Sequence, residues 1–124
     1  MIEPIKQNSK LYKGVHWKFQ FRILEEDSDA YRQIDFTGGD IITFRAGKDT
    51  GDSPLPIDLS SSDSPSKITV DSSDNYLITI LLDETDTLLD EIGDLKAEID
   101  FYSSSDSEWK RIIEFSPLQL IEKV

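Results

Sequence analysis

The sequence contains no cysteine and only one histidine, His16, so the residues of several reactive centres are missing. Disulfide bonds, thiolate metal sites and cysteine nucleophiles all need the thiol that this chain lacks. Zinc and iron sites usually take two or more imidazole or thiolate ligands, and no Gly-x-Ser-x-Gly turn accompanies His16 to build a hydrolase triad. We therefore expect a protein that is not an enzyme and that carries no cofactor and no metal ion.

Basic residues are scarce as well, with 13 lysines and arginines against 25 aspartates and glutamates and a net charge of −12. Such a charge repels the phosphates of nucleic acids and anionic lipids. No apolar run approaches the roughly 18 residues of a membrane span, and residues 1–8 lack the apolar centre of a signal peptide. We expect neither a nucleic-acid nor a membrane partner. The charge leaves open a small inhibitor that mimics nucleic acid and captures a basic enzyme.

What the sequence does contain is a strict alternation of apolar and polar residues, seen first in residues 15–24 and again in residues 95–102. A period of two places one set of side chains on a buried face of a β-strand and the other set in water. The pattern predicts sheets with one buried face. It places Trp17 in the core and His16 on the exposed face.

Turn-forming segments divide the rest of the chain into further short strands. An acidic start and Gly93 shortly afterwards predict one short helical turn near residues 83–91. Pro117 is expected to end the strand before it, leaving a short last strand or tail. The strands are expected at residues 41–46, 55–59, 67–70, 76–82, 94–102 and 109–115. About seven to nine short strands predict an all-β fold, an antiparallel β-sandwich of the Ig-like or Greek-key type.

The chain is long enough for one domain, which we place at residues 14–124. Residues 1–13 are predicted to be an N-terminal arm or an edge strand, because Pro4 lacks the N–H group that a central strand needs. An arm of this kind can pair with the sheet edge of a neighbouring protein. Ile2, Pro4 and Ile5 are therefore candidate contact residues.

Two aromatic residues complete the predicted contact surface. Trp109 begins a predicted strand, and Tyr102 occupies one of the polar positions of an alternating strand, so both side chains are candidates for exposure. Exposed aromatic rings leave open a second function, a module that binds host-surface carbohydrate. Calcium could assist such binding through aspartate-rich turns, although none has the spacing of an EF-hand loop. These turns are residues 27–29, 49–52, 71–75 and 106–108.

Several segments together resemble a known group of proteins. They are residues 34–38 leading into 41–45, residues 78–80 with Glu84, Thr85 and Leu88, residues 93–100, and residues 109–115. This pattern resembles the small β-sandwich modules of tailed-phage virion proteins, including the modules at the start of baseplate upper proteins that anchor receptor-binding parts. The resemblance covers roughly residues 14–121. Leu95 stands where that family usually has a tyrosine.

The resemblance implies a structural component of a tailed-phage virion, acting as a non-enzymatic adaptor or surface fitting at the tail or baseplate, the neck or the capsid. Its partners would be other virion proteins in multiple symmetric copies. Its location would be the virion, after assembly in the host cytoplasm.

Overall fold

The structure is a computed structural model that describes residues 5–25, 29–47, 56–87 and 93–121, with the backbone alone for residues 5–9 and 116. Strands account for most of the described elements, and the strand-rich fold predicted from the alternation is confirmed. The elements are β1 (Ile5–Tyr12), β2 (Trp17–Phe21), β3 (Ile41–Gly47), β4 (Ile57–Ser60), β5 (Ile68–Asp71), η1 (Ser72–Asp74), β6 (Leu77–Leu82), β7 (Gly93–Ser103) and β8 (Glu108–Ile121).

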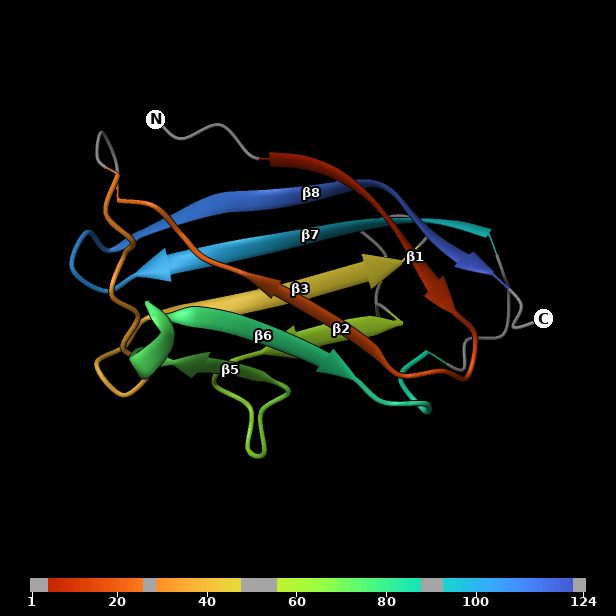
Figure 1. Cartoon of the computed structure of the whole chain (residues 1–124), viewed down its shortest axis with the longest axis horizontal. Coiled ribbons are helices and arrows are strands. Elements are labelled where there is room, and N and C mark those ends of the chain that lie inside the picture. Colours follow the sequence, from red (N-terminus) through yellow and green to blue (C-terminus); the bar gives the residue numbers. More distant parts are fainter. Residues whose placement is uncertain (1–4, 26–28, 48–55, 88–92, 122–124) are drawn as a thin grey trace.

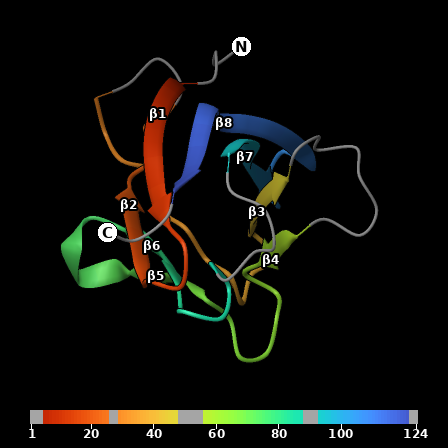
Figure 2. The same ribbon diagram turned by 90° about the vertical axis from the view of Figure 1, so that its right-hand side faces the viewer.

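These strands form two sheets, which Figures 1 and 2 show from two directions. The larger sheet has the order β1-β8-β7-β3-β4, and the smaller has the order β2-β6-β5. All neighbours are antiparallel except β1 and β8, which are parallel, so the expectation of a wholly antiparallel arrangement was wrong at this edge. A parallel pair needs a long connection. Here the rest of the domain lies between the two strands and supplies it.

Only residues 83–87 of the helical turn predicted near residues 83–91 are described, and they are not assigned as a helix. This segment instead forms one hydrogen-bonded turn, in which the N–H groups of Asp86 and Thr87 donate to the Asp83 carbonyl at 3.1 and 3.3 Å. The Asp83 carboxylate caps this turn by accepting from the N–H groups of Thr85 and Asp86, both at 3.0 Å, and Asp86 accepts from the Asp83 N–H at 2.8 Å. The turn is not continued as a helix within residues 83–87. Residues 88–91 lie outside the described residues. The helix that the described residues do contain is η1.

Pro117 does not end the strand that contains it, contrary to the prediction. On β7, Ala97 pairs with Phe115 and Leu95 pairs with Leu118, so Ser116 and Pro117 together face one residue. The pairing of β1 shifts at the same place. A bulge leaves one residue of a strand unpaired, which is how a sheet accommodates the missing N–H of proline. Strand β8 therefore runs on to Ile121.

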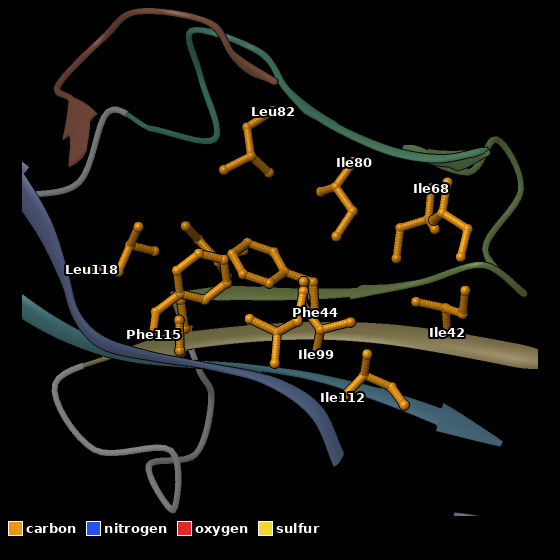
Figure 3. Close-up of a cluster of buried hydrophobic side chains, with 14 of the residues drawn as sticks. Ile42, Phe44, Ile68, Ile80, Leu82, Ile99, Ile112, Phe115 and Leu118 are labelled. Carbon is orange, nitrogen blue, oxygen red and sulfur yellow. The ribbon is translucent and has the colours of Figure 1, made fainter. Parts of the chain in front are cut away.

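The core lies between the two sheets and is built by the alternation seen in the sequence. The ring of Trp17 stacks on Phe44 with centroids 5.6 Å apart, and Phe19 meets Phe115 edge-on at 5.2 Å. The predicted core position of Trp17 is thus confirmed. Figure 3 shows Ile80 and other side chains of the smaller sheet pointing towards the larger one. Because interiors are close-packed, this aromatic contact fixes how the sheets face each other.

Candidate functional site

The hairpin of β7 and β8 carries the most exposed aromatic side chain of the described residues. Tyr102 and Trp109 lie directly opposite each other on the two strands, and their ring centroids are 5.3 Å apart with planes tilted by 49°. Trp109 is 51% exposed, whereas Tyr102 is partly buried. Directly opposed side chains in an antiparallel pair support each other. The two predicted contact residues therefore form one aromatic pair on the outer face of the larger sheet.

Ion pairs continue this outer face next to the aromatic pair. Arg111 lies two residues along β8 from Trp109, and its guanidinium contacts Glu98 at 2.7 Å, Asp100 at 3.0 Å and Glu114 at 3.6 Å. On β3, Arg45 contacts a carboxylate of β4, Asp58, at 3.3 Å. These charged side chains point to the outer face of the sheet, whereas the core residues of the same strands point to the inner face.

Burial and like charge act on the carboxylate at the centre of this network. Burial raises the pKa of Glu98, and Asp100 and Glu114 add to the rise, while Arg111 and Arg45 oppose it. The hydrogen bond to Asp100 raises the pKa of the Arg111 guanidinium. Arg111 thus holds three carboxylates in fixed positions, because a guanidinium presents its N–H donors in a rigid fork.

A shallow hollow of about 500 Å³ opens between the aromatic pair and the ion pairs. Thr43 is largely buried and forms its floor, since the long side chains of neighbouring strands rise on both sides. Its lining residues are Thr43, Arg45, Asp100, Trp109, Lys110 and Arg111. An exposed indole beside fixed donors and acceptors can bind a ligand that has both an apolar face and hydroxyl groups.

Of the other predicted contact residues that the structure describes, Tyr102 and Ile5 are not among the residues that line this hollow. Ile5 belongs to β1, where its backbone pairs with Ile113 of β8. Ile2 and Pro4 lie outside the described residues. Among the lining residues, only Trp109 was predicted, and sequence reasoning missed Thr43, Arg45, Asp100, Lys110 and Arg111. The two arginines carry the ion pairs of this face. They share the polar parity of their strands, but their meeting depends on β3 lying beside β7, which alternation within one strand does not reveal.

Strand β1 forms an edge of the larger sheet. It pairs with β8 from Ile5 to Tyr12, and within the described residues no strand pairs with its other side. Leu11 is fully buried and anchors the strand on the core. An edge strand presents unpaired backbone N–H and C=O groups, to which another strand can add.

A second hollow, of about 240 Å³, lies at one end of the sheets and includes Arg32 and Phe101. Arg32 donates to the hydroxyls of Ser103 and Ser105 at 3.3 and 3.4 Å and lies over the ring of Phe101. It also lies 3.8 Å from the buried carboxylate of Asp40. These contacts tie loops together, which indicates a structural role.

The aspartates of three turns accept hydrogen bonds from their own loops. Asp35, Asp71 and Asp83 each accept from the N–H and the hydroxyl of the serine or threonine two residues later, at 2.6–3.1 Å. These hydrogen bonds lower the pKa of each carboxyl. Such turns explain acidic loops without a bound ion. The described residues hold no group of three or more potential ligands placed around one metal ion. The turn at 49–52 and residues 27–28 lie outside the described residues.

Comparison with protein families and with curated sequences adds no relative to these observations. Neither a protein-family model nor a curated protein sequence matches the chain. Within the part of the chain that the structure describes, no helix has the length and apolar character for crossing a membrane.

Proposed function

We propose that this chain is a structural component of a tailed-phage virion, a non-enzymatic adaptor or surface fitting that binds neighbouring virion proteins. The observation that carries the proposal is the edge strand β1, which has a sheet partner on one side only among the described residues. An edge of eight residues is long for a strand that has no partner on that side. In the adaptor, this edge receives a strand of the neighbour.

The segments that carry the resemblance support the same proposal. Residues 35–39 form the turn before β3, residues 83–87 form the turn after β6, and residues 93–115 contain the β7–β8 hairpin. They are thus framework segments. We also propose that the fold is a β-sandwich of the Ig-like or Greek-key type, and the packing of two sheets on one aromatic core supports this. The proposed location is the tail or baseplate, the neck or the capsid of the particle.

Strand addition at β1 also fits assembly in several copies. Backbone hydrogen bonds supply most of the affinity in such contacts, and they do not require a large apolar patch on the isolated domain. A symmetric particle repeats one contact at each equivalent position. The acidic surface keeps unassembled copies apart, because molecules of the same charge repel.

Two adjacent proline substitutions in β1 test the contact. Neighbouring residues of a strand direct their backbone N–H groups to opposite sides. Of the two variants Ser9→Pro and Lys10→Pro, one therefore removes an N–H donor on the free edge of β1, and the other removes an N–H donor on the side that faces β8. Thermal unfolding identifies the free-edge variant as the one with the nearly unchanged Tm. That variant should lose incorporation into particles. Normal incorporation of the stable variant would reject strand addition at β1.

A further inference from the structure

The geometry points to a neutral saccharide as the ligand of the outer-face hollow, with one sugar ring stacked on Trp109 and its hydroxyls bound by the neighbouring ion-paired side chains. This inference concerns a different face from β1 and goes beyond the adaptor role.

Trp109 supplies the apolar surface of the proposed site. Half of this side chain is exposed at the wall of a hollow, while the other tryptophan, Trp17, packs against the core. Tyr102 lies against Trp109 from the neighbouring strand and limits how the indole can turn. A fixed, exposed indole offers a flat apolar surface at little cost in side-chain entropy. The C–H face of a sugar ring matches that surface.

Planar carboxylate and guanidinium groups line the hollow beside the indole. Asp100 accepts a hydrogen bond from Arg111 at 3.0 Å, and Arg45 contacts Asp58 at 3.3 Å. A carboxylate keeps further acceptor sites after one such bond, and a guanidinium has five N–H donors. Donor and acceptor groups held side by side match the hydroxyls of a sugar. The side chains of Glu98 and Asp100 are only 13% and 17% exposed, so binding beside the Arg111 ion pairs orders few side chains.

Charge decides between neutral and anionic ligands. The guanidinium of Arg111 faces three carboxylates, that of Arg45 faces Asp58, and the ammonium of Lys110 lies 3.8 Å from Asp106, so all three positive charges that line the hollow have a carboxylate partner. The chain as a whole carries a charge of −12. A phosphate, an acidic sugar or an acidic peptide would enter a repulsive field. The size also fits, because small-ligand sites have volumes of roughly 300–1,000 Å³ and this hollow has about 500 Å³.

The test is a titration of the full chain with neutral tetrasaccharides of glucose, galactose, mannose and N-acetylglucosamine, observed in ¹H–¹⁵N NMR spectra. The two tryptophans give two indole N–H signals, and Trp109→Phe identifies them by removing one. At least one of these tetrasaccharides should shift the Trp109 signal in a saturable manner and leave the Trp17 signal in place. Tetramers of sialic acid and of galacturonic acid serve as the acidic comparison.

Variants then assign the binding to the proposed groups. Trp109→Ala should weaken binding about tenfold or more, as loss of aromatic contact and of buried area implies, whereas Trp109→Phe keeps a ring and should retain most of the affinity. Leu81→Ala is the matched control, because Leu81 is 48% exposed on the other sheet. Saturable shifts with this variant pattern support the site. No shift with any neutral tetramer, binding of the acidic tetramers alone, or equal affinity in Trp109→Ala would overturn it.

Discussion

Replacing Asp40 by asparagine should clearly destabilise the protein, because this buried carboxylate accepts three hydrogen bonds. The side chain of Asp40 is 3% exposed, and its carboxylate joins two loops. One oxygen accepts from the Asp35 N–H at 3.0 Å, and the other accepts from the N–H and the hydroxyl of Ser104, both at 2.9 Å. An asparagine keeps one oxygen acceptor but places an NH₂ donor against one of these donors.

The expected size follows from these contacts. Hydrogen bonds to charged groups contribute about 1.5–3 kcal/mol each, and a buried donor left without a partner costs about 1–3 kcal/mol. Asparagine retains part of the set, so we expect the free energy of unfolding to fall by about 2–4 kcal/mol. For a domain of this size, that corresponds to a decrease in Tm of roughly 8–16 °C.

The effect should depend on pH in a defined direction. Burial alone would raise the pKa of Asp40, but hydrogen bonds from Asp35 and Ser104 and the charge of Arg32 outweigh it and lower the pKa. An acid with a lowered folded-state pKa stabilises the protein above its unfolded pKa of about 3.9, and this contribution disappears as pH falls through the folded-state value. The difference between wild type and Asp40→Asn should therefore be largest near neutral pH and should shrink below about pH 4.

Urea unfolding followed by tryptophan fluorescence and far-ultraviolet circular dichroism at pH 7 and at acidic pH measures both quantities. Asp29→Asn is the control, because it removes the same charge from an exposed position. The reasoning fails if the two variants have the same stability at pH 7, or if the difference between them does not decrease towards low pH.

Three further changes test the core, a buried turn and the outer face. Phe115→Ala should lower the unfolding free energy by about 3–5 kcal/mol in urea titrations, because Phe115 is 3% exposed and packs between the sheets. A loss below about 1 kcal/mol would contradict the core described above. Thr87→Val keeps the shape of a fully buried side chain but removes the 2.8 Å hydrogen bond to the Val15 carbonyl. Thermal unfolding should therefore show an unfolding free energy that is lower by about 1–3 kcal/mol. An unchanged Tm would argue against that bond. Arg111→Gln should lower the unfolding free energy by about 1 kcal/mol at pH 7, after allowance for screening of its exposed guanidinium. The loss should be smaller near pH 4, where protonation of Glu98 removes its repulsion by the neighbouring carboxylates. A larger loss at pH 4 would be inconsistent with this explanation.

Alternation along the sequence predicted the strands and their buried faces well. Residues 15–24 and 95–102 predicted β2 and most of β7, and they placed Trp17 against the core. Local pattern carries this information because successive side chains of a strand point to opposite faces. The exposure of Trp109 followed from its position at a strand start.

Pairing between distant strands was less predictable. The parallel contact of β1 with β8 and the continuation of β8 through Pro117 depend on which strand lies beside which and on a bulge. The ion pairs of Arg111 and Arg45 depend on the order β8-β7-β3-β4 in the same way. Alternation is a property of one strand and does not specify its neighbours.

The most direct test of the proposed virion role is quantitative mass spectrometry of gradient-purified particles, with this chain counted against the major capsid protein. The proposal predicts a fixed copy number in multiples of five, six or twelve, as a vertex, tail or capsid position requires. Absence of the chain from purified particles would contradict the proposal.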